Sequence, residues 1–288
     1  MIVSRSGGSL RLVRQVEHGR VAGELASAWG NEVFEAAAPH VAVCTAAARH
    51  DDGWRAWDAR VLFNEDERRP LNFLEIEAGE HIRLYRQGRK RVSLENVYAG
   101  VLVGMHWTGL YRGRWSAPGA QARIGMGADD RALQDRVVRS EQRRWVDAKE
   151  QAWTEPEPRS AFETRLWHNY ELLQLWDLLS LYLSVMPQEP GPGSAAVPWG
   201  PQLRELEHSP QEVSLPSVAT RPGVAPVPVT ASVRTFGEVT LDPFPLNAPV
   251  SVEVEQTVLP DRRWTRAEAV QRVRTTPTSA VAWRLVPR

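Results

Sequence analysis

The segment from Ser160 to Met186 constrains the fold of this chain more than any other part. Leucine, tyrosine and tryptophan recur through it at helical spacing and cover almost the whole circumference of the predicted helix. A helix that is apolar on every face must be buried on every face, so we predict a central helix around which other helices pack. Asp177 lies within this segment, where a lone carboxylate would cost roughly several kcal/mol or remain protonated.

Further helices are predicted before Pro187. Apolar residues at helical spacing, or alanine-rich composition, indicate helices over 10–29, 41–49 and 96–110. Gly30-Asn31 ends the first of these as a helix C-terminus should. The segment 132–151 is charged with sparse apolar positions, and we expect an exposed helix there. The stretch 62–92 is ambiguous, because 73–76 and 82–85 fit short strands or loop as well as helix.

The pattern changes after Pro187. Ten prolines lie between Pro187 and Pro228, both included, which excludes long helices and favours loop. Alternating apolar residues then predict strands over 227–236, 250–254 and 280–286. Thr265 followed by Glu268 predicts a capping box at the start of one short helix.

These patterns predict a mainly α fold with three parts: a helical domain over 1–186, a Pro-rich connection over 187–223, and a small antiparallel β-rich portion over 224–288 packed on the helices. Basic and acidic residues number 35 each and are interspersed, so nucleic acid is not an expected partner. No apolar run of about 18 residues predicts a membrane span. The single cysteine, Cys44, fits a reducing compartment, and we expect a cytoplasmic protein.

The string His50-Asp51-Asp52-Gly53-Trp54 is the most unusual local feature. It follows an apolar, alanine-rich helix, so its histidine and first aspartate should lie near the core. A buried charged pair needs compensation, and a divalent cation commonly supplies it. Taken alone, the string is explained more simply as a solvated helix end with Gly53 in a turn.

Three further positions favour a shared site. His18, His106 and Asp177 each lie on the apolar face of a predicted helix and therefore point toward the core. Each alone could be a hydrogen-bonded core residue, but together they are better explained by one cluster. Two imidazoles and two carboxylates suit Zn, Fe, Mn, Ni or Co. The four candidate metal ligands are His18, His50, Asp51 and Asp177.

The order of these residues along the chain resembles the HD superfamily of metal-dependent phosphohydrolases, in which a first His, a His-Asp pair and a late Asp bind the metal. That resemblance implies an HD-domain or phosphodiesterase-like helical bundle that hydrolyses a phosphoester. The chain resembles more closely an uncharacterised bacterial family, known as a domain of unknown function, which implies no activity. The strings that carry this second resemblance are 15–18, 29–31, 50–54, 103–106, 169–180 and 241–244.

We therefore predict a metal-dependent hydrolase, of a phosphoester, that uses a metal-bound water on a small-molecule substrate. Asp51 and His106 are the candidates for direct roles in catalysis, and His106 could instead hold a second metal or contact substrate. Gln15 and Gln174 lie within about one helical turn of a proposed ligand, as substrate contacts or outer partners of the ligands.

The alternative is a non-catalytic metal- or ligand-binding protein with the same fold. The histidines that we expect to be exposed, in loops or at helix ends, are His40, His81 and His208.

Overall fold

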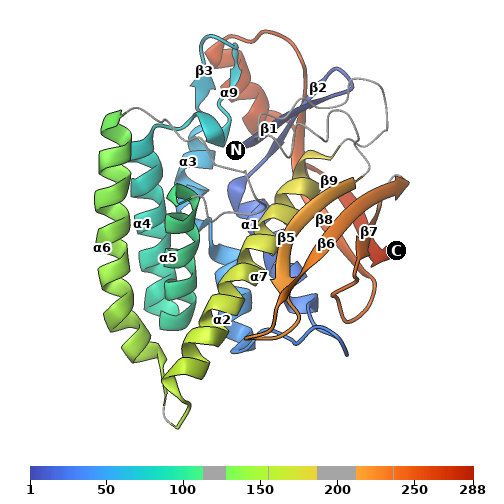
Figure 1. Cartoon of the computed structure of the whole chain (residues 1–288). Helices are drawn as coiled ribbons and strands as arrows, with labels where there is room; N and C mark the ends of the chain where they lie inside the picture. The colour runs from blue at the N-terminus through green and yellow to red at the C-terminus, as the bar shows by residue number, and fades with distance from the viewer. Residues whose placement is uncertain (113–127, 155, 187–211, 236) are drawn as a thin grey trace.

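The computed structural model describes residues 1–112, 128–154, 156–186, 212–235 and 237–288. About 53% of the chain is helical and about 23% is strand. The predicted mainly α, HD-like bundle with a small β portion is therefore wrong, because the protein has an α/β fold. A curled sheet forms one side of the molecule and the larger helices form the other (Figure 1).

The sheet has seven strands drawn from both ends of the chain (Figure 1). Their spatial order is β1 (Ile2–Ser6), β2 (Ser9–Val13), β8 (Val250–Pro260), β9 (Ser279–Pro287), β7 (Glu238–Asp242), β6 (Pro226–Thr235) and β5 (Glu212–Ala219). Neighbouring strands are antiparallel, except for the parallel pair β7 and β9. The predicted domain division at residues 186 and 223 stays a prediction, and 187–211 lie outside the described residues.

The hairpin β1–β2 is one reason why the sheet is larger than predicted. Its two-residue turn is Gly7-Gly8, with φ angles of 53° and 74°. Such turns need positive φ at both positions, which glycine adopts at low cost. Leu10 and Leu12 fit helical spacing, but they belong to β2, and the helix predicted over 10–29 begins only at Gln15.

Strand β5 lies in the proline-rich region that was predicted as loop. It forms one edge of the sheet, and its register with β6 shifts between Leu215 and Val218, on either side of Pro216. Proline is tolerated at sheet edges and bulges, because no ladder hydrogen bond is needed from its nitrogen there. Proline content therefore did not exclude a strand.

Two helices lie between the sheet and the remaining helices. Helix α1 (Gln15–Ala28) contacts β8, and α7 (Arg159–Val185) contacts β1 and β5. The central, buried position predicted for α7 is confirmed, since nearly all its residues after Leu166 are buried. The other large helices are α2 (His40–Arg49), α4 (Ala78–Glu95), α5 (Val97–Tyr111) and α6 (Ala128–Ala152) (Figure 1).

Two smaller sequence predictions have different outcomes. The capping box of Thr265 and Glu268 is confirmed at the start of α9 (Arg266–Thr275). The segment 82–85 lies within α4, so strand or loop is wrong there. In the part of the chain that the structure describes, no helix combines the length and apolarity needed to cross a membrane.

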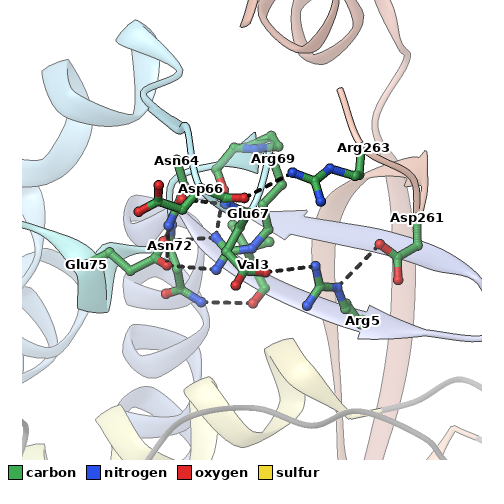
Figure 2. A network of polar contacts seen from close by, with 11 residues as sticks. Val3, Arg5, Asn64, Asp66, Glu67, Arg69, Asn72, Glu75, Asp261 and Arg263 are labelled. Atoms are coloured by element: carbon green, nitrogen blue, oxygen red, sulfur yellow. Dashed lines mark hydrogen bonds and ion pairs between the residues drawn. The ribbon is translucent and has the colours of Figure 1, made fainter. Parts of the chain in front are cut away.

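A polar network holds the hairpin of β3 (Phe63–Asn64) and β4 (Arg69–Pro70) against the short 3-10 helix η2 (Phe73–Glu75) (Figure 2). The carboxylate of Glu75 is at its centre. It accepts hydrogen bonds from the Arg69 guanidinium at 2.7 and 2.9 Å and from the Asn64 side chain at 2.8 Å. It also accepts from the backbone nitrogen of Asn72 at 2.7 Å, which closes a capping box.

The same network fixes η2 to the first strand of the sheet (Figure 2). The Asn72 side chain donates to the carbonyl of Val3 in β1 at 2.9 Å. Arg5, also in β1, lies 3.5 Å from Glu67 and 3.3 Å from Asp261. The position of η2 therefore depends on the sheet.

We predict that Glu75→Gln destabilises the protein by about 1–2 kcal/mol at neutral pH, because it weakens both the capping box and the ion pair with Arg69. Burial acts to raise the pKa of Glu75, but the hydrogen bonds from Arg69 and Asn72 outweigh it and lower the pKa. The stabilisation is then present above the ordinary carboxyl pKa and is lost as pH falls through the lowered folded pKa. Urea unfolding should show wild type and variant converging at acid pH; an equal difference at both pH values would contradict this role.

Candidate metal centre

Five ionisable side chains meet in the helical layer. They come from four different helices or the residues that follow them: His18 from α1, His50 and Asp51 from the end of α2, His106 from α5 and Asp177 from α7. Each is between 1% and 3% exposed. Buried ionisable groups at this density need mutual compensation, and these are the five that the sequence singled out.

Two imidazoles face two carboxylates at short range. His18 Nε2 lies 3.0 Å from Asp51 Oδ2, and His50 Nε2 lies 3.2 Å from Asp177 Oδ1. The crossed distances are 3.8 Å from His18 Nε2 to Asp177 Oδ1 and 3.9 Å from His50 Nε2 to Asp51 Oδ2. The four side chains therefore converge around one point.

His106 extends this cluster on one side. Its Nε2 lies 4.0 Å from Asp177 Oδ2, and its ring meets that of His50 edge to face with centroids 4.8 Å apart. Two groups of three have ligand atoms within 4.8 Å of one another and could hold a metal ion. The first contains His18, His50 and Asp51, and the second contains His50, His106 and Asp177.

Hydrogen bonds outside the cluster fix the orientation of two imidazoles. His50 Nδ1 lies 2.8 Å from the carbonyl oxygen of Ala47, which can only accept, so Nδ1 carries a proton. Ser180 donates its hydroxyl proton to the backbone carbonyl of Asp177 at 2.8 Å. It therefore accepts from His18 Nδ1, also at 2.8 Å. In both histidines Nε2 is the atom left to face a carboxylate.

Each of these nitrogens would repel its carboxylate unless a positive charge lies between them. A lone pair held about 3 Å from a carboxylate oxygen in the interior is unfavourable, so either a proton or a cation must intervene. His50 Nε2 forms no aligned hydrogen bond with any described residue, although Asp177 is close. A nitrogen and an oxygen atom that lie close together without a well-aligned hydrogen bond are arranged as ligands of a shared ion would be.

Without an ion, protons supply the positive charge that is needed between the imidazole nitrogens and the carboxylates. Burial acts to lower the pKa of His50, but the charges of Asp51 and Asp177 outweigh it and raise the pKa to about 9. Burial acts in the opposite direction on Asp177, where the positive charge of His50, 3.2 Å away, outweighs it and lowers the pKa. A metal would displace such protons, because it binds deprotonated ligands.

Helix α4 supports the cluster from outside. Tyr85 donates its hydroxyl to Asp51 Oδ1 at 2.7 Å, which leaves Oδ2 for the imidazoles. Arg91 bonds both the side chain and the backbone carbonyl of Asp52 at 2.7 Å. At Gly53, a Cβ would lie 2.0 Å from the carbonyl oxygen of Leu84, so only glycine allows this approach to α4. The segment that carries His50 and Asp51 is thus fixed to α4 by three contacts.

A cavity of about 30 Å³ adjoins the cluster, with space for about two water molecules. Phe73 and Leu74 of η2 form part of its wall, so the polar network of Figure 2 sets the position of that wall. Among the described residues that line it there is no lysine or arginine. They are Gln15, His18, Asp51, Phe73, Leu74, His81, Tyr85, His106, Leu110, Asp177 and Leu181.

The two glutamines of the sequence analysis lie in different places. Gln15 lines the cavity, and its Oε1 has no hydrogen-bond partner among the described residues. Gln174 is buried but does not line this cavity, and its Nε2 would lie 3.4 Å from a Cβ placed on Gly109 of α5. The structure therefore brings Gln15, and not Gln174, to the cavity.

Sequence reasoning missed the contribution of α4. His81 was expected to be exposed, but it is 1% exposed and lines the cavity with Tyr85. The available signal was helical spacing, since His81, Tyr85, Gly88 and Val92 fall on one face. Of the other two histidines expected at the surface, His40 is exposed and His208 lies outside the described residues.

The fold and the cluster define an α/β protein with a buried candidate metal centre built from histidine and aspartate. The chain belongs to the family described as Protein of unknown function (DUF3891), whose model matches residues 1–261. That match includes all five clustered residues. No curated protein and no solved structure matches the chain. The predicted resemblance to a domain of unknown function is thereby confirmed, and the resemblance to the HD superfamily stays a prediction.

We predict that Gly53→Ala destabilises the protein by roughly 1–3 kcal/mol or more, because the new Cβ forces the loop away from α4. The matched control is Gly79→Ala in the first turn of α4, where nothing lies within 4 Å of the added Cβ. This control should be neutral or stabilising by about 0.5–1 kcal/mol. Thermal unfolding of both variants would measure the difference, and equal stabilities would contradict the close packing at Gly53.

Proposed function

We propose that His18, His50, Asp51 and Asp177 bind a divalent cation and that the protein is a metal-dependent hydrolase of a phosphoester. The observation that carries the metal site is the pair of Nε2 atoms that face carboxylate oxygens at 3.0 and 3.2 Å. Both rings have their Nδ1 atoms engaged elsewhere, as metal-binding histidines commonly do.

The donor set favours particular ions. Two imidazole nitrogens and two carboxylate oxygens suit Zn, Fe, Mn, Ni or Co. Tyr85 bonds the far oxygen of Asp51 and Ser180 bonds the far nitrogen of His18, which orients both groups before an ion arrives. We therefore expect tight binding with little rearrangement.

The cavity beside the cluster supports hydrolysis. A divalent ion at this position would lower the pKa of water bound to it toward neutrality. His106 lines the same cavity, and burial lowers its pKa to about 4, so its ring is neutral at neutral pH. A neutral imidazole can orient the attacking water or accept its proton, and it can also coordinate a second ion.

The choice of a phosphoester as the substrate is supported by the order of the candidate ligands along the chain. The order His18, His50-Asp51, Asp177 matches the ligand order of the HD superfamily, while the α/β fold gives no support for an HD bundle. With no lysine or arginine among the described lining residues, the charge of a phosphoryl group would be offset by the metal.

A non-catalytic metal-binding protein is the second candidate. The observation that favours it is the size of the cavity, because about 30 Å³ admits water but not a whole phosphoester without movement. Bound metal without turnover would support this alternative.

We predict that Asp177→Asn sharply reduces metal binding, because a neutral amide is a poorer ligand for a dication than a carboxylate. Wild type should carry metal on elemental analysis, and a chelator should lower its melting temperature, since bound ligand stabilises the folded state. Asp147→Asn, at an exposed position of α6, should match wild type in both measurements. Full metal occupancy in Asp177→Asn, or a metal-free wild type indifferent to chelator, would refute the metal centre.

We predict that metal-loaded wild type hydrolyses bis-para-nitrophenyl phosphate and that chelator abolishes the reaction. His106→Gln should lower kcat by roughly a hundredfold or more, the usual contribution of a positioned acid or base, while most of the metal remains bound. Metal-loaded wild type that hydrolyses neither this diester nor the corresponding monoester would favour the non-catalytic alternative.

A further inference from the structure

His81 gives the cavity a polar group that is separate from the five clustered residues. It comes from α4 and lines the cavity together with His18, Asp51, His106 and Asp177. Its ring packs edge to face on Trp54, with centroids 5.5 Å apart, and lies against Tyr85 at 4.6 Å. The ring is therefore held in one orientation by neighbours that are themselves buried.

The hydroxyl of Tyr111 determines which nitrogen of His81 carries the proton. It forms a hydrogen bond with His81 Nδ1 and with no other described residue. Burial raises the pKa of Tyr111, so the hydroxyl keeps its proton and needs an acceptor. Burial lowers the pKa of His81 to about 3, so the ring is neutral and one nitrogen has a free lone pair. Tyr111 donates to Nδ1, and the single ring proton lies on Nε2.

Among the described residues the His81 ring bonds Tyr111 alone, through Nδ1, and its Nε2 is not one of the fully buried polar atoms that lack a partner. The ring lines a cavity with space for about two water molecules, so Nε2–H can donate to water there. A substrate oxygen that displaces this water would take over the hydrogen bond. A neutral N–H donor bonds an anionic oxygen better than it bonds a neutral acceptor. It also avoids the cost of burying another charge.

We propose that His81 is a substrate-binding residue that donates a hydrogen bond from Nε2 to an oxygen of the phosphoryl group, and that Tyr111 positions it by fixing the tautomer. This inference rests on the proposed function. Such a donor contributes to rate when its bond strengthens as negative charge develops on the oxygen. No proton needs to leave His81 during the reaction.

The test uses the full-length, metal-loaded protein with bis-para-nitrophenyl phosphate as the probe. His81→Phe removes the donor and should lower kcat/KM by roughly 10²–10³, while metal content and melting temperature stay close to those of wild type. His81→Gln keeps an N–H donor and should recover part of the loss. Tyr111→Phe should give a smaller loss, because the donor remains but its tautomer is no longer fixed.

A second measurement does not depend on turnover. Nitrogen chemical shifts of the histidine rings should show His81 with its proton on Nε2 in wild type, and a mixture of tautomers in Tyr111→Phe. A ring that carries its proton on Nδ1 in wild type would overturn the assignment directly.

The outcomes separate this inference from the proposed function. Wild-type kcat/KM in metal-loaded His81→Phe overturns the role of His81 and leaves the hydrolase intact. Loss of metal from His81→Phe also overturns it, since His81 would then act through the ligands. No more activity in His81→Gln than in His81→Phe counts against a donor role. Metal-loaded wild type without turnover removes the proposed function, and this inference with it.

Discussion

The arrangement of the helices depends on an electrostatic requirement in the interior. Asp51 and Asp177 are buried carboxylates, and each faces an imidazole nitrogen whose partner nitrogen is already bonded elsewhere. The desolvation cost of such groups is offset only if a positive charge lies among them. Because the candidate ligands come from α1, α2 and α7, any cation that neutralises them would also tie these three helices together.

The sheet and the polar network around Glu75 hold the surroundings of the cluster in place. Helix α7 is apolar on almost every face, and it is covered by β1 and β5 on one side and by α1, α2 and α5 on others. The network around Glu75 places η2, and with it Phe73 and Leu74, at the cavity. The cavity wall is thus held by groups that lie outside the candidate site and contribute no chemistry to it.

The sequence predicted those features of the fold and the candidate site that have a signature within a short segment of the chain. The buried helix around Asp177 and the inward faces of His18 and His106 follow from helical spacing alone, and the structure brings these side chains together. The pairing of Leu10 with Leu259 has no local signature, so the size of the sheet could not be read from either end of the chain. His81 was missed because its helix is strongly polar on one face and its segment also fitted loop. Only tertiary packing shows that Tyr111 bonds its Nδ1.

The pairing of β2 with β8 also sets the order in which the molecule can be completed during synthesis. Helix α1 carries His18 and follows directly after β2, yet the strand on which β2 pairs ends at Pro260. Closing a contact between such distant parts of a chain is slow compared with forming helices. On the ribosome, one edge of β2 therefore stays without its partner strand until most of the chain has emerged. The pairing of β2 is completed late, although β2 is made among the earliest elements.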